Sequence, residues 1–285
     1  MSPAGRWVVR HAPDWPAFAG PDWLDTIMSV DVPDREHRKQ GRAIGRWSLT
    51  APDGRRLVVF LKRHFELPGR HGWLAKLLPG RAWSPGLQEW EHLRWAAAAG
   101  LPVPRAVTAG EWRGPGGRLQ SFLAIEELAD QLPLHEAIPL AAGRLPTDVF
   151  ERWKRGLTAE LARLTRLLHE RRHFHRDLYL CHFYIPEADT HSVPDGWAGR
   201  VTMIDFHRLR RASWLGQTPA RTKDLAQLLF STYDVVGITD RDRWRFARAY
   251  CRGWLTGIDS VPVYSLAVSR ANRYARHNAR RAAGR

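Results

Sequence analysis

Apolar residues spaced three or four positions apart predict two helices in the middle of the chain. The first runs through the apolar positions from Leu87 to Ala97 and ends before Gly100. The second is longer and amphipathic, and it ends near Glu170. Its apolar stripe consists of Phe150, Trp153, Leu157, Leu161, Leu164 and Leu168.

Shorter apolar runs bounded by turn residues predict strands. One run extends from Arg55 to Lys62, after the turn signal Pro52-Asp53-Gly54, and a second extends from Ser121 to Leu128. A Pro-rich connection follows the second run, so we expect a boundary between two parts of the molecule there. Two more short strands are expected at 183–185 and 201–204, on either side of a polar loop.

Segments outside these elements complete the expected organisation. Pro13, Pro16 and Pro21 make residues 1–30 look irregular, and residues 270–285, with six arginines, look like a basic tail. Residues 31–128 then form a small part with a sheet and one helix. Residues 129–269 form a larger, mainly helical part. Two further helices are expected there, at 222–234 and at 240–255, and Thr239 with Asp242 resembles a capping box at the start of the second.

The balance of charges narrows the classes of partner. A formal charge of +15 at pH 7 favours a polyanion, either nucleic acid, an anionic membrane face or a phosphorylated substrate, although arginine-rich composition alone also explains it. No apolar run approaches the roughly 20 residues of a membrane-spanning helix. Without an apolar leader, and with only Cys181 and Cys251, the chain is expected to stay in the cytoplasm.

The segment His175-Arg176-Asp177 after the long helix matches the catalytic loop of kinases. Phosphoryl transfer requires a base for the attacking hydroxyl, and we assign this role to Asp177. His175 and Arg176 are grouped with Asp177 as catalytic candidates. Protein kinases place a metal-binding asparagine five residues after the aspartate, where this chain has His182. His182 is therefore a candidate metal ligand, in addition to the aspartate described next.

Asp205 follows the predicted strand 201–204 and stands where kinases place the aspartate that holds Mg²⁺. Upstream, Lys62 ends a strand and is the candidate for binding the nucleotide phosphates. Glu89 or Glu91 could pair with it, and since they lie about 200° apart around a helix, only one can face Lys62. The order of these residues along the chain predicts an ATP- and Mg²⁺-dependent kinase.

The glycine-rich loop is the weakest part of this pattern. Gly41 and Arg42 lie in a segment with two glycines but no G-x-G-x-x-G, so a phosphate cradle and a simple turn are both open. At the expected boundary, Glu126 and Leu128 are assigned to the nucleotide site. Only 19 positions separate Asp205 from Asp224, which leaves little room for the activation segment of a protein kinase, so a small-molecule acceptor is favoured.

Two motifs make the match more specific: His175-Arg176-Asp177-x-Tyr179-x-x-His182-Phe183 and Ile204-Asp205-x-His207-Arg208. Together they resemble the lipopolysaccharide core heptose kinase family, of the Kdo/WaaP type. The resemblance extends from about Asp31 to about Trp254. It implies an α+β fold of the bilobal protein-kinase-like kind, in which residues 31–128 are the N-lobe and residues 129–269 the C-lobe.

The resemblance also implies roles for single residues. It favours Glu89 over Glu91, makes Gly41 and Arg42 the phosphate loop, and gives Asp224 the task of bracing the catalytic loop without touching the substrate. The implied reaction transfers the γ-phosphate of ATP to a hydroxyl of heptose in the lipopolysaccharide inner core, with heptose I favoured. The acceptor alternatives are heptose II, Kdo and an aminoglycoside-like small molecule.

The resemblance implies that the partner is a lipopolysaccharide core precursor and that the protein contacts the anionic inner face of the cytoplasmic membrane. Binding of nucleic acid is not expected. Such a precursor carries phosphates and sugar carboxylates, so it would give a purpose to the positive charge. The competing interpretation is a catalytically silent, kinase-shaped protein that binds anions. No protein partner can be predicted from the sequence.

Overall fold

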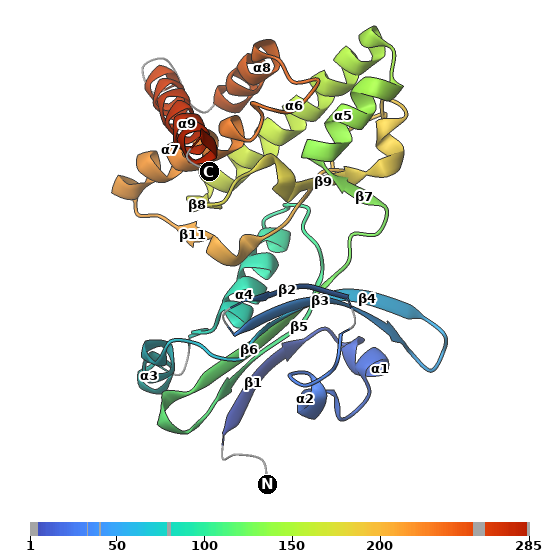
Figure 1. The fold of residues 1–285 in the computed structure, drawn as a ribbon, viewed down its shortest axis with the longest axis vertical. Helices are drawn as coiled ribbons and strands as arrows, with labels where there is room; N and C mark the ends of the chain where they lie inside the picture. The colour runs from blue at the N-terminus through green and yellow to red at the C-terminus, as the bar shows by residue number, and fades with distance from the viewer. Residues whose placement is uncertain (1–4, 33, 40, 79–80, 253–259, 284–285) are drawn as a thin grey trace. The chain divides into compact units, whose positions relative to one another are not determined.

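The structure is a computed structural model, drawn in Figure 1, that describes residues 5–32, 34–39, 41–78, 81–252 and 260–283. The chain separates into two units. Unit 1 comprises Met1–Ala99 and Val103–Leu128, and unit 2 comprises Gly100–Pro102 and Ala129–Arg285.

Unit 1 contains, in its described residues, an antiparallel sheet of six strands in the order β1-β5-β6-β4-β3-β2. The strands are β1 (Arg6–His11), β2 (Asp34–Lys39), β3 (Arg42–Thr50), β4 (Arg56–His64), β5 (Ala106–Arg113) and β6 (Leu119–Glu126). Its helices are α1 (Trp15–Ala19), α2 (Trp23–Thr26), α3 (Gly69–Leu77), α4 (Pro85–Ala98) and the short η1 (Pro115–Gly117).

The alternation of residues along β4 fixes the orientation of its side chains. Leu57, Val59 and Leu61 are buried in the core of unit 1, and the alternate position Lys62 lies on the opposite face of the sheet. Helix α4 begins where Ser84 caps it, because the Ser84 hydroxyl accepts a hydrogen bond from the backbone of Leu87. The predicted strand and the helix that follows it are confirmed, although β4 continues two residues beyond Lys62, to His64.

The expectation that residues 1–30 are irregular is wrong. Residues 6–11 form β1, an edge strand paired with β5, and α1 and α2 follow it. Pro16 lies in the first turn of α1, where proline is tolerated because the N–H it lacks would have no helical partner. Trp15 and Trp23 pack edge to face with ring centroids 5.7 Å apart, and both are buried. This segment therefore completes the core of unit 1.

Unit 2 is mainly helical in the part of it that the structure describes. Its longer helices are α5 (Leu134–Arg144), α6 (Thr147–Glu170), α7 (Gln217–Phe230), α8 (Asp240–Cys251) and α9 (Ser260–Ala283). Its strands are short: β7 (Gln131–Pro133), β8 (His173–Phe174), β9 (Phe183–Pro186), β10 (Thr202–Met203) and β11 (Arg210–Arg211). Single turns of 3₁₀ helix are η2 (Leu180–His182), η3 (Glu187–Thr190), η4 (Phe206–Arg208) and η5 (Trp214–Gly216).

Two of the predicted helices in unit 2 are confirmed in detail. Helix α6 buries the stripe that starts at Phe150 and ends at Leu168. Helix α8 begins with the expected capping box of Thr239 and Asp242. It ends at Cys251, before the predicted end at 255, and residues 253–255 lie outside the described residues. The expected helix at 222–234 corresponds to α7, which starts and ends earlier.

Residues 270–283, expected to be part of a basic tail, continue helix α9; the segment is basic and largely exposed, but it is helical. Val263, Ala267 and Ala271 repeat every four residues on one face of this helix and are buried against α6, α7 and α8. The arginines lie on the remaining faces. Small alanine side chains, Ala267 and Ala271, form part of the apolar stripe of this helix, so the stripe is hard to recognise among the arginines.

The predicted α+β fold, with a small antiparallel sheet and a mainly helical larger part, is confirmed. Three helices of unit 1, α1 to α3, were not expected. No helix among the described residues is long and apolar enough to cross a lipid bilayer.

An ion pair inside unit 2 connects α6 to α8 and generates a stability prediction. Lys154 Nζ lies 2.8 Å from Asp242 Oδ2, and both side chains are buried. Asp242→Asn removes one of two carboxylates around the buried Lys154 ammonium, and the other, Glu151 at 2.8 Å, is more exposed. The variant should therefore lower the free energy of unfolding by about 2 kcal/mol, measured in urea at pH 7. Asp240→Asn, on the same turn but exposed, is the matched control. Equal losses in the two variants would contradict this role.

The same pair predicts a pH dependence. Burial acts to raise the pKa of Asp242, but hydrogen bonds from Lys154 and Thr239 outweigh it, so the pKa lies below its ordinary value of 3.8. The stabilisation is therefore present above pH 3.8 and is lost as the pH falls through the lower, folded-state pKa. Parallel unfolding curves of the wild type and Asp242→Asn should converge only below pH 3.8.

Candidate active site

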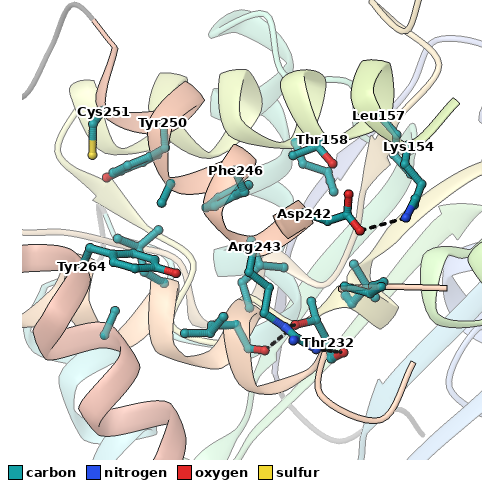
Figure 2. Close-up of a pocket in the computed structure, with 18 of the residues that line it drawn as sticks. Lys154, Leu157, Thr158, Thr232, Asp242, Arg243, Phe246, Tyr250, Cys251 and Tyr264 are labelled. Atoms are coloured by element: carbon teal, nitrogen blue, oxygen red, sulfur yellow. Dashed lines mark hydrogen bonds and ion pairs between the residues drawn. The ribbon is translucent and has the colours of Figure 1, made fainter. Parts of the chain in front are cut away.

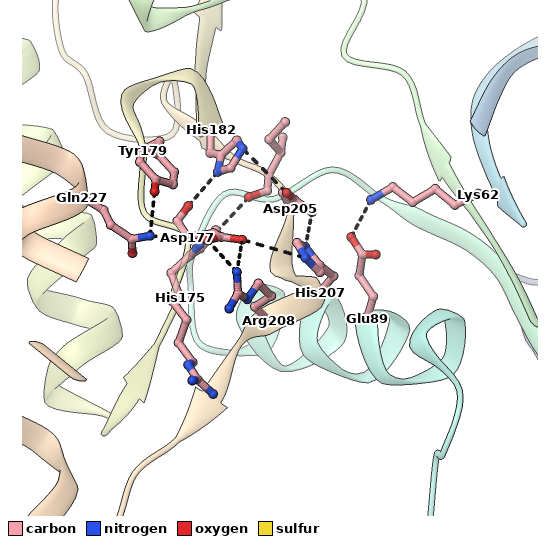
Figure 3. A network of polar contacts seen from close by, with 12 residues as sticks. Lys62, Glu89, His175, Asp177, Tyr179, His182, Asp205, His207, Arg208 and Gln227 are labelled. Carbon is pink, nitrogen blue, oxygen red and sulfur yellow. Dashed lines mark hydrogen bonds and ion pairs between the residues drawn. The ribbon is translucent and has the colours of Figure 1, made fainter. Parts of the chain in front are cut away.

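Unit 1 contributes a lysine and a glutamate that contact each other. Lys62 Nζ on β4 donates to Glu89 Oε1 on α4 at 2.8 Å, and Figure 3 shows the two side chains pointing toward one another. Glu89 is buried, whereas Glu91 is exposed. The predicted pairing of Lys62 with Glu89 rather than Glu91 is confirmed. The pair holds the lysine in a fixed position, as phosphate binding would require.

Gly41 and Arg42 lie at the turn between β2 and β3. Gly41 has a φ of +70°, a left-handed conformation that glycine adopts without strain, and its carbonyl accepts a hydrogen bond from Phe65. Arg42 is exposed at the start of β3. The segment is a tight hairpin turn, and its use as a phosphate loop stays a prediction.

The last strand of the sheet of unit 1 ends at Glu126, whose carboxylate accepts a hydrogen bond from Arg105 at 2.6 Å. Its neighbour Glu127 binds Arg46 through both carboxylate oxygens, at 2.6 and 2.8 Å, and this interaction lowers the pKa of Glu127. Sequence reasoning missed the Arg46 contact because 81 positions separate the two residues. Leu128 is half-buried. Nucleotide binding by Glu126 and Leu128 stays a prediction.

In unit 2, a buried carboxylate holds the loop that contains His175 and Arg176. Asp224 on α7 has no exposed surface, and its two oxygens accept the backbone N–H groups of His175 and Arg176, each at 2.7 Å. His169 Nε2 lies 3.3 Å from the same carboxylate. The expectation that Asp224 braces the catalytic loop is confirmed. The brace holds Arg176 at a φ of +68°, which is unfavourable for a side chain of this size.

His175 is directed away from solvent. Its ring is fully buried, with Nε2 2.9 Å from the carbonyl oxygen of Ile204, and burial lowers its pKa. Nε2 therefore donates from a neutral ring to the strand that precedes Asp205. His175 connects the catalytic loop to that strand. A catalytic part for it can only be indirect, through the position of its neighbours.

Asp177 is held by two side chains from later in the chain. Arg208 Nη1 lies 3.2 and 3.3 Å from the two oxygens of the Asp177 carboxylate, and Gln227 Nε2 donates to Oδ1 at 3.4 Å. Gln227 also donates to the Tyr179 hydroxyl at 3.0 Å. We did not expect Gln227 at the site, and no local sequence signal identifies it. These contacts fix the direction of the carboxylate, as a positioned base requires.

Asp205 lies between two histidines (Figure 3). Its Oδ1 is 2.5 Å from His207 Nδ1, and its Oδ2 is 3.7 Å from His182 Nε2. His207 Nε2 is in turn 3.9 Å from Asp177 Oδ2, so His207 stands between the two carboxylates. Asp205 has a φ of +65°. A strained backbone at this position is typical of functional sites.

His182 lies between the backbone of Asp177 and the carboxylate of Asp205. Its Nδ1 is 2.7 Å from the backbone carbonyl of Asp177 and therefore donates, which leaves Nε2 facing Asp205. Burial acts to lower the pKa of His182, but contact with Cys181, the carbonyl of Asp177 and the charge of Asp205 outweigh it and raise the pKa. Protonation of Nε2 would place a positive charge 3.7 Å from the Asp205 carboxylate and would leave this ring no lone pair for a metal. His182 as a ligand stays a prediction.

The carboxylate at Asp205 is suited to a metal ion that a nucleotide also binds. Among the described residues there is no group of three or more His, Cys, Asp and Glu that could enclose an ion. Mg²⁺ usually takes one or two protein carboxylates, with phosphates and waters as its remaining ligands. Asp205 supplies such a carboxylate. The residues therefore fit an ion brought in by a nucleotide and do not form an all-protein metal cage.

The Asp224 brace should dominate the stability of this loop. Asparagine offers one acceptor oxygen, and its amide group would face a backbone N–H, so Asp224→Asn should lower the free energy of unfolding by about 2–4 kcal/mol in urea. Asp234→Asn, which changes an exposed aspartate in the segment after α7, is the matched control. A loss no greater than that of the control would show that the brace is dispensable.

Comparison with known proteins places this geometry in a family. The lipopolysaccharide kinase (Kdo/WaaP) family model matches residues 51–250. The lipopolysaccharide core heptose(I) kinase WaaP of Pseudomonas aeruginosa is 37% identical over 167 residues, 58% of this chain and 59% of that protein. The protein of the same name from Escherichia coli K12 is 30% identical over 57% of this chain and 58% of its own length.

The chain thus spans under two thirds of the curated relatives it matches. A solved structure, WaaP in complex with acyl carrier protein, superimposes with a TM-score of 0.67 and 30% identity, covering 94% of this chain and 98% of that one. The predicted kinase-like fold is confirmed by this likeness. The chain belongs to the lipopolysaccharide kinase (Kdo/WaaP) family.

Proposed function

We propose that this protein transfers the γ-phosphate of ATP to a hydroxyl of heptose in the lipopolysaccharide core. The observation that carries the proposal is the pair Asp177 and Asp205, one oriented by Arg208 and Gln227 and the other contacted by His207. Two positioned carboxylates would provide a base, Asp177, and a metal ligand, Asp205. Family membership and the names of the relatives support a sugar acceptor.

Asp177 would accept the proton of the attacking hydroxyl as the oxygen–phosphorus bond forms and ADP departs. Arg208 holds the carboxylate by both oxygens, and this contact would orient it toward the acceptor. Arg176 and His175 would act as positioning residues, because their backbone N–H groups are fixed by Asp224. Their side chains need not touch the substrate.

The residues assigned to ATP and Mg²⁺ divide into phosphate contacts, nucleotide contacts and a metal ligand. Lys62, fixed by Glu89, would bind phosphate oxygens, and the hairpin turn at Gly41 and Arg42 would lie over them. Glu126 and Leu128 would contact the nucleotide. Asp205, with His182 beside it, would hold Mg²⁺, which when bound neutralises charge on the phosphates. The rest of the site supplies orientation through hydrogen bonds within unit 2.

Heptose I is the favoured acceptor, because both relatives named above are heptose(I) kinases. Heptose II, Kdo and an aminoglycoside-like acceptor are the alternatives that an assay must exclude. Such an acceptor belongs to a lipid-anchored precursor, so we place the protein in the cytoplasm, peripheral to the inner face of the membrane. The formal charge of +15 favours that anionic surface.

The assignment of the base is tested by Asp177→Asn. Transfer of radiolabelled γ-phosphate from ATP to isolated core lipopolysaccharide should fall by about 10²–10⁴-fold, the usual contribution of a general base. ATP with Mg²⁺ should still raise the melting temperature of this variant, since its metal ligand is intact. Asp195→Asn, which alters an exposed aspartate, should keep full activity. Undiminished transfer by Asp177→Asn would remove Asp177 from the mechanism.

A companion variant separates metal binding from base catalysis. Asp205→Asn should lose the additional thermal stabilisation that Mg²⁺ gives in the presence of ATP. If the wild-type protein itself shows no shift with ATP and Mg²⁺, the silent anion-binding interpretation is favoured over the kinase.

A protein partner follows from the solved structure, in which WaaP is in complex with acyl carrier protein. We infer that this chain also binds an acyl carrier protein. Unit 2 contains a cavity among α6, α7, α8 and α9 whose lining is largely apolar (Figure 2). Its apolar lining includes Leu157, Leu161, Leu225, Phe246, Val263 and Ala267. Such a lining suits an acyl chain, because it offers burial of apolar surface without unpaired polar groups.

Filling the cavity should weaken binding to the acylated carrier. Thr158 lines it, so Thr158→Trp should weaken binding of the acyl form about tenfold or more by calorimetry, while the carrier without an acyl chain binds both proteins equally. Ala159→Trp introduces the same side chain at an exposed position one residue away and is the control. Identical binding by Thr158→Trp and the wild type would exclude the cavity as the acyl site.

A further inference from the structure

We propose that α3 is a membrane-docking element that inserts apolar side chains into the interface of an anionic bilayer. The large apolar residues of this helix and of the residue after it lie on the solvent side. Their exposed fractions are 66% for Trp73, 36% for Leu74, 64% for Leu77 and 48% for Leu78.

The apolar pattern of α3 is inverted relative to an ordinary surface helix. Its buried positions are small: Gly72 and Ala75 are three positions apart and face the protein. The exposed large residues form two i, i+4 pairs, Trp73 with Leu77 and Leu74 with Leu78. A soluble helix gains stability from the opposite arrangement, in which large residues are buried. Packing of unit 1 therefore does not explain why these residues are large and apolar.

The outward orientation of this stripe is fixed by close contacts on the inner face. A Cβ at Gly72 would lie 1.7 Å from the carbonyl oxygen of Gly117, so α3 lies against the turn between β5 and β6 (Figure 1). Arg113 Nη1 also donates to the carbonyl of Ala75 at 3.1 Å. The helix cannot rotate to bury Trp73 without breaking both contacts. The exposed stripe is a fixed surface of unit 1.

The charge around the stripe is complementary to anionic lipid. The sequence of residues 67–84 has three basic residues and no Asp or Glu, and one of the three, Arg81, is exposed. Arg118, on the adjoining turn, is exposed. Exposed tryptophan and leucine among basic residues are the composition of helices that lie in the headgroup region of membranes. A neutral protein partner would need the apolar surface but not this charge.

The choice of a bilayer also rests in part on the proposed function, because the acceptor would be a lipid-anchored molecule. Insertion of α3 would then keep the protein at the surface that carries its substrate. The apolar stripe would insert into the bilayer, and the exposed arginines would attract the protein to anionic headgroups. Salt should weaken this electrostatic attraction.

Vesicle co-sedimentation tests the proposal without nucleotide or lipopolysaccharide, so its result does not depend on kinase activity. Wild-type protein should bind vesicles of phosphatidylglycerol and phosphatidylethanolamine and bind phosphatidylcholine vesicles more weakly. The variant Trp73→Ser/Leu77→Ser should partition at least about tenfold less. Leu215→Ser/Val236→Ser, which alters two exposed apolar residues of unit 2, should bind as the wild type does. All variants should keep the wild-type melting temperature.

Three outcomes would overturn the proposal. One is failure of the wild type to bind anionic vesicles. Another is unchanged binding by the α3 variant together with loss of binding by Arg276→Gln/Arg280→Gln, which would move the contact to α9. The third is a wild-type dimer in solution that the α3 variant converts to a monomer with vesicle binding unaffected, since the stripe would then be an interface between copies of the chain.

Discussion

The catalytic loop of this protein depends on one buried carboxylate that accepts two backbone N–H groups. Asp224 accepts the backbone N–H groups of His175 and Arg176, and these bonds help to hold Arg176 in its left-handed backbone conformation. The direction of Asp177 follows from that backbone. Its carboxylate then reaches Arg208 and Gln227, which come from different elements. A side chain that need not touch substrate thus determines where the base stands.

Local sequence pattern was sufficient for the elements whose burial repeats along one helix or strand. The stripe on α6, the capping box of α8 and the alternation along the strand that contains Lys62 are each visible in the local sequence alone. The pairing of Lys62 with Glu89 needed more, because helix geometry left Glu89 and Glu91 open and the family resemblance favoured Glu89. These features depend on short-range geometry.

Features that depend on contacts between distant segments could not be predicted in the same way. Trp15 and Trp23 form part of a core that exists only once β1 has paired with β5, and their prolines look like signs of irregular structure in isolation. Gln227 contacts Asp177 because helix α7 packs beside the catalytic loop, although the two residues are 50 positions apart in the chain. The alanines that bury α9 were visible in the sequence, but the arginines around them concealed the pattern.

The left-handed backbone of Asp205 has a consequence for alanine scanning. Aspartate and asparagine tolerate positive φ better than other residues that carry a side chain, because their short polar groups bond locally. Alanine at position 205 would remove the carboxylate and add backbone strain of about 1 kcal/mol at once. An inactive alanine variant would therefore confuse lost chemistry with a displaced strand, whereas asparagine keeps the chain path and isolates the charge.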